Sequence, residues 1–385
     1  MVLLMAAALA TASCGQSVTP SGEASGDWRQ VRGVPLSPRE NAVGVWTGEE
    51  VLLFGGSDAR PCPPNASCLP PKEPPLADGA AYRPATGQWR KLPKAPVGFD
   101  FAEHALIGRT LYVWVTELRG QPRGSAAFMA YQIEQDRWQE LPLPPDHARG
   151  GYNIVSAAGR IIFYRGNDER GDHPDQVYDP RLRSWSELPA DPLSPSSGRT
   201  MVWTGDRLVL FDHELTSDVS GDRPDLARAA VLDLASGAWR RLPDSELLGT
   251  WPWVPVGGRL VNPTLGGEDG GKVNGWGRSY PYGGILDLGT GRWSALPNPP
   301  AEDAEDAGVG LLTPSDGHFF AERGWVLDTA TDRWIRIPEI NEPNGYVQGR
   351  TVVSAGRDLF LFGGARFAGT EADLLNEAWT WSPPG

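Results

Sequence analysis

The sequence has few of the residues that carry metal, redox or nucleophilic chemistry. Its 385 residues include three cysteines and five histidines, and no two histidines form a short-spaced pair. The Gly-x-Ser-x-Gly motif of serine hydrolases and the His-Glu-x-x-His motif of zinc proteases are both absent. The sequence therefore predicts no cofactor and no metal, and it gives a hydrolase no motif support.

Basic residues are also in short supply. There are 35 Lys and Arg residues against 48 Asp and Glu residues, which gives a formal net charge of −13. Duplex affinity depends on neutralising phosphates with Lys and Arg, so we expect no nucleic-acid partner. The acid excess is typical of a chain that stays soluble through its charge.

Long apolar runs are missing, since residues 1–13 form a stretch too short to span a bilayer as a helix. The stretch ends in small residues directly before Cys14, and this resembles a bacterial lipoprotein signal. The resemblance implies a signal peptide over 1–13, a lipid anchor on Cys14 and an extracytoplasmic protein. No Lys or Arg precedes the run and Thr11 replaces the usual Leu, so a cleaved signal peptide with secretion is the alternative. Residues 14–26 predict a flexible tether.

The other two cysteines close a short Pro-rich loop. Five residues separate Cys62 from Cys68. In an oxidising compartment such a pair predicts a disulfide. The alternative is a metal site, but no second cysteine or histidine pair completes four ligands.

What the chain does have is tryptophan, glycine and proline in a regular pattern. An aromatic or aliphatic residue is followed seven positions later by Trp and then by Leu-Pro or Ile-Pro. Six copies place this tryptophan at Trp89, Trp138, Trp185, Trp239, Trp293 and Trp334. The steps between them are 49, 47, 54, 54 and 41 residues. A repeat of about 50 residues with strands and turns is typical of a propeller blade.

A second hairpin precedes each copy. Apolar, β-rich runs joined by tight Gly-containing turns predict hairpins, and near-continuous Val, Leu, Ile and Phe suit strands that are packed on both faces. These inner hairpins cover residues 41–56, 105–115, 154–164, 201–211, 253–261, 310–320 and 351–362.

The two ends of the chain supply the missing outer hairpin. Residues 378–382 match a third strand, and residues 27–31 match a fourth strand with Trp28 in the tryptophan position. The sequence therefore predicts an all-β, seven-bladed β-propeller over residues 27–385, with N- and C-terminal strands sharing one blade. Closure hides the strand edges, so we expect a monomer.

The diglycines at Gly55-Gly56 and Gly363-Gly364, followed by Tyr82 and Trp89 in the first blade, make the chain similar to the Kelch-repeat family. More broadly it resembles the propeller domain of galactose oxidase. The other five blades lose the diglycine, so the repeat is of a degenerate Kelch type. The resemblance implies a fold and not an activity. The copper site of galactose oxidase is not expected, because all three cysteines have other roles.

The longest predicted connections share one face of the ring, where binding usually occurs. Arg39, Arg149, Arg199 and Arg350 each precede an innermost strand in a different blade. This spacing predicts guanidinium groups around the channel mouth, suited to carboxylates or phosphates. The alternative is that each arginine pairs with an Asp or Glu of a neighbouring blade.

Two of these connections carry further candidates. Trp276, Arg278 and Tyr280 lie in the loop 262–283, and Trp251 opens the fifth blade. Exposed aromatic residues beside arginine suit a sugar or a protein partner; the alternative is that they fold back onto the blades. The loop 165–176 is acidic but lacks the spacing of a calcium loop, so a solvated loop is favoured.

The sequence thus favours an envelope binding module for a protein or glycan partner, which acts through its loop face. The alternative is a sugar-processing enzyme, because the Kelch-like propellers that this chain resembles include sialic acid epimerases. An enzyme of that kind predicts an Arg-lined axial pocket that holds a Glu or His of shifted pKa. A binding module predicts exposed aromatic residues on the loop face.

Overall fold

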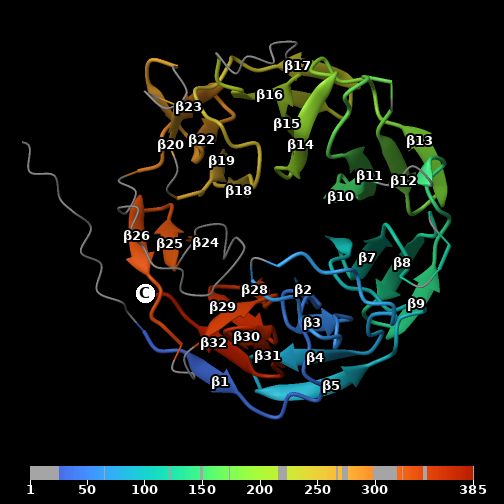
Figure 1. Cartoon of the computed structure of the whole chain (residues 1–385). Helices are drawn as coiled ribbons and strands as arrows, with labels where there is room; N and C mark the ends of the chain where they lie inside the picture. Colours follow the sequence, from blue (N-terminus) through green and yellow to red (C-terminus); the bar gives the residue numbers. More distant parts are fainter. Residues whose placement is uncertain are drawn as a thin grey trace, which may run out of the picture.

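The computed structural model describes residues 26–384, except 65, 120, 123, 148–150, 173, 216–222, 266–267, 271–275, 298–318, 323 and 341–344. All regular structure in these residues is β-strand. Figure 1 shows the strands gathered into small sheets that follow one another around a ring. The fold is a β-propeller, as the sequence predicts.

Six of the sheets have four antiparallel strands each, ordered from the axis outward. The first is β2 (Val43–Trp46), β3 (Val51–Phe54), β4 (Gly79–Arg83) and β5 (Gln88–Leu92). The second is β6 (Glu103–Ile107), β7 (Thr110–Val115), β8 (Ala127–Gln132) and β9 (Arg137–Glu140). The third is β10 (Tyr152–Ala157), β11 (Arg160–Arg165), β12 (Gln176–Asp179) and β13 (Ser184–Glu187).

The fourth sheet is β14 (Ser196–Trp203), β15 (Leu208–Glu214), β16 (Ala227–Asp233) and β17 (Ala238–Arg241). The fifth is β18 (Val254–Val256), β19 (Arg259–Asn262), β22 (Gly284–Asp287) and β23 (Arg292–Ser294). A sixth sector contains three described strands, β24 (Phe319–Glu322), β25 (Trp325–Asp328) and β26 (Arg333–Arg336). The first strand expected there lies outside the described residues, so the count of seven complete blades stays a prediction.

The remaining four-stranded sheet closes the ring. It is ordered β28 (Thr351–Ala355), β29 (Asp358–Phe362), β32 (Ala378–Trp381) and β1 (Arg29–Val31). Strand β1 pairs antiparallel with β32, with Gln30 opposite Trp379. Figure 1 shows these first and last strands side by side. The predicted closure by N- and C-terminal strands in one blade is confirmed.

The repeated tryptophan links each blade to the one before it. Its Nε1–H donates to a main-chain carbonyl in the preceding blade, in most cases that of the proline in the Leu-Pro or Ile-Pro pair. The seven bonds of 2.7–3.2 Å are Trp28 to Pro338, Trp89 to Arg32, Trp138 to Pro93, Trp185 to Pro142, Trp239 to Pro189, Trp293 to Pro243 and Trp334 to Pro297. We call these residues the rim tryptophans. Their contacts explain why Trp and Leu-Pro recur together.

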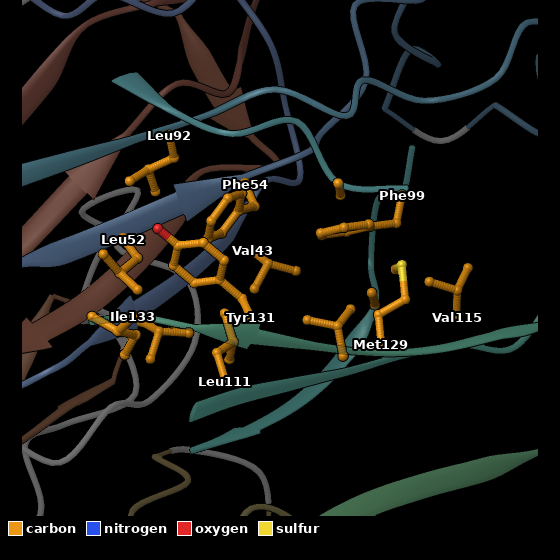
Figure 2. Close-up of a cluster of buried hydrophobic side chains, with 14 of the residues drawn as sticks. Val43, Leu52, Phe54, Leu92, Phe99, Leu111, Val115, Met129, Tyr131 and Ile133 are labelled. Atoms are coloured by element: carbon orange, nitrogen blue, oxygen red, sulfur yellow. The ribbon is translucent and has the colours of Figure 1, made fainter. Parts of the chain in front are cut away.

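The core lies between neighbouring blades. In β3, Leu52 and Phe54 pack against the second blade, while Val51 and Leu53 pack against the closing blade. Figure 2 shows the first of these layers, in which Phe54 faces Tyr131 with ring centroids 5.0 Å apart. All four β3 side chains are fully buried. Burial on both faces is why the inner strands are apolar without alternation.

The diglycine of the first blade is required by a close main-chain approach. Gly55 and Gly56 have φ angles of +69° and +93°. A Cβ atom on Gly55 would collide with the carbonyl oxygen of Phe99, and that same oxygen accepts a hydrogen bond from Gly56 N at 2.8 Å. Only glycine fits both the backbone conformation and the space.

Two segments that we predicted as loops instead contain strands. Residues 262–283 include the hairpin β20 (Glu268–Gly270) and β21 (Ser279–Pro281). Residues 365–377 include β30 (Ala365–Ala368) and β31 (Glu371–Leu374), and β30 pairs with both β31 and β27 (Tyr346–Gln348). The sequence reason is visible in β30, where buried Ala365 and Phe367 alternate with half-buried Arg366, the period of a strand.

The predicted disulfide between Cys62 and Cys68 is confirmed, with Cα atoms 5.9 Å apart. It points to an oxidising environment. Residues 1–25, including Cys14, lie outside the described residues, so the signal peptide, the lipid anchor and the tether stay predictions. Within the described residues there is no helix long and apolar enough to cross a membrane.

Candidate functional site

Arg39, the first of the predicted channel-mouth arginines, is buried and forms structural hydrogen bonds within the first blade. Arg39 is 1% exposed, and its Nη1 and Nη2 donate to the two carboxylate oxygens of Asp78 at 2.7 and 3.2 Å. Nη1 also donates to the carbonyl oxygen of Gly55 at 3.0 Å. The Arg39 hydrogen bonds hold the pKa of Asp78 below its ordinary value. The alternative interpretation expected an acidic partner from a neighbouring blade, whereas Asp78 directly precedes β4 of the same blade.

Arg199 is buried in the same way. It is 3% exposed and donates to Asp175 at 2.8 Å and to Asp191 at 2.9 Å. Burial raises the pKa of Asp175, although Arg199 opposes that shift. Neither Arg39 nor Arg199 is exposed at the channel mouth. Arg350 is half-buried, and Arg149 lies outside the described residues.

The acidic loop 165–176 is tied to the next blade. Asp168 is 4% exposed, and its main chain forms a two-way bridge with Ser196. Its carboxylate accepts a hydrogen bond from Gly171 N at 3.1 Å. Among the described residues, no group of three or more His, Cys, Asp or Glu side chains could hold a metal ion.

The aromatic candidates form one cluster on the loop side of the fifth blade. Arg278 lies over the ring of Tyr280 with its Cζ 4.6 Å from the centroid, and Trp276 meets the same ring edge-on at 6.2 Å. Glu246 accepts from both Nη atoms of Arg278, at 2.6 and 3.3 Å. These contacts hold the guanidinium over the tyrosine ring, where cation–π attraction adds to the ion pair.

Trp251 is the most exposed tryptophan among the described residues, at 57%. The segment that carries it runs beside β21, because Leu248 N donates to the Pro281 carbonyl at 2.9 Å. Tyr282 follows β21 and is 37% exposed. We call Trp251, Trp276, Arg278, Tyr280 and Tyr282 the aromatic site. Exposed rings of this kind offer flat apolar faces to a ligand.

Sequence reasoning missed a histidine that belongs to the same surface. The ring nitrogen Nε2 of His213, in β15, lies 2.7 Å from the carbonyl oxygen of Leu248. A carbonyl only accepts, so Nε2 carries a proton. Asp225 Oδ2 lies 3.9 Å from Nδ1, and burial raises the pKa of Asp225. No local pattern signals this histidine, because its neighbours come from 12 to 37 residues further along the chain.

Two carboxylates at the starts of innermost strands also have raised pKa values. Burial raises the pKa of Glu40, just before β2, and nearby Asp100 raises it further. Burial likewise raises the pKa of Glu103, the first residue of β6, although its carboxylate accepts a hydrogen bond from Ile154 N. Both residues lie where innermost strands begin.

The four-stranded antiparallel sheets define a β-propeller. No family model matches the chain. It is similar to N-acetylneuraminate epimerase of Brucella suis (strain ATCC 23445 / NCTC 10510), with 22% identity over 74% of this chain and 73% of the relative. At this identity the similarity supports the shared propeller fold.

Proposed function

We propose that this protein is a glycan-binding β-propeller that works outside the cytoplasm and contacts sugar through the aromatic site. The observation behind the proposal is that Trp251 and Tyr282 are exposed and that Arg278 is already fixed on Tyr280. Aromatic faces stack on the apolar faces of sugar rings, and guanidinium donors reach sugar hydroxyls. A fixed arginine loses little side-chain entropy when a ligand binds.

The charges around the aromatic site favour a glycan over an acidic partner. Glu246 accepts from two of the Arg278 nitrogens, so much of the positive charge is already compensated. The whole chain carries a net charge of −13, which repels acidic proteins and phosphate-rich ligands at long range. An uncharged ligand that uses stacking and hydrogen bonds meets neither obstacle.

The proposal includes the cell envelope as its location. The Cys62–Cys68 disulfide supports an oxidising compartment. The lipoprotein-like sequence before Cys14 supports an anchor, with residues 15–26 as the spacer between membrane and propeller. Metabolic labelling of the expressing cells with a fatty-acid analogue, for the natural chain and for Cys14→Ser, tests the anchor. Loss of label in the variant is expected, and equal labelling contradicts it.

Glycan arrays followed by calorimetry on the purified protein test the binding role. We expect Trp251→Ala to weaken glycan binding by at least tenfold, which corresponds to about 1.4 kcal/mol. Leu182→Ala is the matched control, since Leu182 is 73% exposed in the third blade and lies outside the aromatic site. Absence of any glycan ligand, or equal affinity in natural protein and Trp251→Ala, contradicts the proposal.

A second candidate function is a sugar-processing enzyme that works at the channel rim. The raised pKa values of Glu40 and Glu103 favour it, because acid–base catalysis uses groups with pKa values closer to neutral pH. The name of the relative, an N-acetylneuraminate epimerase, indicates which substrate to try first. The interconversion of N-acetylneuraminate epimers can be followed by NMR. Enzyme function predicts a rate above buffer that falls at least tenfold in Glu40→Gln or Glu103→Gln, and a rate equal to buffer removes this candidate.

A further inference from the structure

The chain enters the innermost strand of five blades through a residue with a left-handed backbone. In each of these blades the residue lies two positions before one that pairs with an aromatic residue of the second strand: Phe54, Trp114, Tyr164, Phe211 or Phe362. The five residues are Asn41, Phe101, Gly151, Gly198 and Gly349, with φ angles of +58°, +49°, +74°, +57° and +68°. Glycine and asparagine adopt this backbone readily, whereas bulky residues rarely do. Phe101 is therefore the exception among the five.

Phe101 gains little packing that could offset this strain. Its side chain is 77% exposed, whereas Phe99, two residues earlier, is 1% exposed in the core layer of Figure 2. A single exposed apolar residue is ordinary, but one that also strains the backbone does not serve the folding of its own chain. The first blade meets the same backbone requirement with Asn41. The exposed ring of Phe101 therefore points to a contact with another molecule.

A hollow of about 330 Å³ lies next to the segment that carries Phe101, between connections of the first and second blades. Pro75, Gly98 and Arg119 are among the residues that line it. Gly98 is three residues before Phe101, and Nη2 of Arg119 donates to Asp100, the residue directly before Phe101, at 2.5 Å. This ion pair ties the segment that carries the exposed ring to the wall of the hollow.

A second hollow, of about 270 Å³, adjoins the first. Val97 and Leu118 line both, and Phe128, Leu141 and Leu143 line the second. An apolar cavity of about 150 Å³ holds a benzene ring, so each hollow has room for a large apolar side chain. In an extended peptide, alternate side chains lie on the same face about 6.5 Å apart. Two adjoining hollows fit two such side chains of one peptide.

The polar groups at the hollows suit a peptide that carries positive charge. In the described part of the chain, the side chains of Gln121 and Ser125 at the first hollow form no hydrogen bond, so they can pair with main-chain amides. Arg119 and Glu140 are the charged residues that line the hollows. Arg119 is paired with Asp100, whereas Glu140, the exposed last residue of β9, has no ion pair among the described residues. The surface thus has an uncompensated negative charge, on a chain whose net charge is −13.

We propose that Phe101 and the two hollows form a docking groove for an extended, basic peptide segment of a partner protein. Two apolar side chains of the segment enter the hollows, the ring of Phe101 is covered by the segment, and a Lys or Arg of the segment pairs with Glu140. Figure 1 shows β4 and β8, of the first two blades, across the ring from β20 in the aromatic site. This inference therefore goes beyond the glycan function and does not rest on it.

A selection for peptide ligands supplies the probe. Random dodecapeptides displayed on phage are selected on the immobilised protein, and the recovered sequences are synthesised and measured by calorimetry. We expect these peptides to share two apolar side chains at alternate positions and a Lys or Arg. Failure to recover any peptide whose binding calorimetry reproduces, or recovery of acidic peptides, overturns the inference.

Phe101→Asn separates a binding role from a structural one. Asparagine relieves the left-handed backbone, as Asn41 does in the first blade, so we expect the melting temperature to rise by about 1–3 °C. Affinity for the selected peptides should fall at least tenfold. Leu182→Asn is the matched control, because it replaces an exposed apolar residue whose φ is not positive, and it should change neither value. A lower melting temperature in Phe101→Asn, or an unchanged peptide affinity, contradicts a docking role for Phe101.

Glu140→Lys tests the charge of the partner. We expect affinity for the selected peptides to fall at least tenfold in Glu140→Lys and less in Glu140→Gln. Glu187→Lys is the matched control, since Glu187 is the exposed last residue of β13, the same strand of the next blade, and the net charge changes equally. Equal losses in the two Lys variants would mean long-range repulsion without docking at Glu140, which overturns the charge assignment.

The outcomes also keep this inference apart from the glycan proposal. A selected peptide whose affinity falls in Trp251→Ala and not in Phe101→Asn binds at the aromatic site, which overturns the docking groove. Peptide binding that depends on Phe101 and Glu140 in a protein that binds no glycan supports the docking groove and contradicts the glycan proposal alone.

Discussion

The rim tryptophans and the tryptophans of the aromatic site show one residue type in two roles. A rim tryptophan such as Trp138 donates to the preceding blade and packs edge-on against Phe54 at 4.9 Å. Trp251 follows no period and exposes 57% of its surface. The periodic tryptophans hold the ring together, whereas Trp251, which is out of period, stays exposed.

The arginines likewise divide into a buried group and an exposed one. Arg39 precedes β2 and Arg199 lies within β14, and both are buried in ion pairs. Arg278 occurs once, in an insertion of the fifth blade, and its side chain is 55% exposed. The buried arginines belong to the scaffold and the exposed arginine belongs to the surface. Substitutions of the buried arginines and rim tryptophans should therefore lower stability, whereas substitutions in the aromatic site should lower glycan affinity.

The largest effect is expected at Arg199. Arg199→Met leaves Asp175 and Asp191 buried without their cation, so we expect a loss of about 3–5 kcal/mol in the free energy of unfolding. Chemical denaturation measures it. Arg137→Met, which removes an exposed arginine bonded only to Gln132, is the control and should change stability by less than about 0.5 kcal/mol. Similar values for the two variants would show that the buried arginines are not structural.

Breaking the disulfide should have a smaller effect. Cys62→Ser with Cys68→Ser opens a short loop, for which chain entropy predicts a loss of about 2 kcal/mol or less. The contact of the loop with β27, where Gln348 Nε2 donates to the Cys62 carbonyl at 2.9 Å, should then become weaker. Hydrogen exchange of this loop, compared with that of β3, measures whether the change stays local. Faster exchange throughout β3 would contradict a local role.

A pair of conservative substitutions tests whether the rim tryptophans and Trp251 have different roles. Trp138→Phe removes the bond to Pro93 and part of the packing on Phe54, so it should lower stability by about 1 kcal/mol and leave glycan affinity unchanged. Trp251→Phe should do the reverse, with little effect on stability and weaker binding. Thermal unfolding and calorimetry on both variants give the four values. A stability loss in Trp251→Phe as large as that in Trp138→Phe would remove the distinction.

The smallest expected effect is on the pH dependence of the melting temperature, through Glu103. Burial raises the pKa of Glu103, so the folded state favours the protonated side chain over the charged one. The stability gained in this way is fully present below the pKa of Glu103 in the unfolded chain. It is lost as the pH rises through the pKa of Glu103 in the folded protein. Glu103→Gln stays uncharged, so we expect its melting temperature to exceed that of the natural protein by roughly 1–2 °C at pH 8. The difference should vanish near pH 4. A variant that is less stable at pH 8 would show that the charged form is favoured instead.

The ring could be predicted from the sequence because its determinants are local and repeated. Trp89 and the residues that follow it carry the same information as Trp239 and its neighbours, so each blade supports the assignment of the others. Closure was predictable because Trp28 has the spacing of a fourth strand. The hairpins β20–β21 and β30–β31 were not predicted, because they occur once each and no second copy reveals them.

The candidate site was predictable only in part. The aromatic residues of the loop 262–283 stood out by composition, but the partner of Arg278 comes from Glu246, 32 residues earlier. His213 and Leu248 meet, as do the walls of the docking groove, only because separate segments converge in the fold. Contacts of this kind depend on tertiary packing, and no spacing in the chain encodes them.

Strand β1 is held in the ring by three paired positions with β32 and by the bond from Trp28 to Pro338. Each neighbouring strand of the first five blades is joined to the next by continuous chain, whereas this junction is non-covalent. Tension that reaches the propeller through the residues before position 26 acts first at this seam. Under mechanical load, β1 should separate from β32 before any other blade unfolds, and the two strands should pair again when the load is removed.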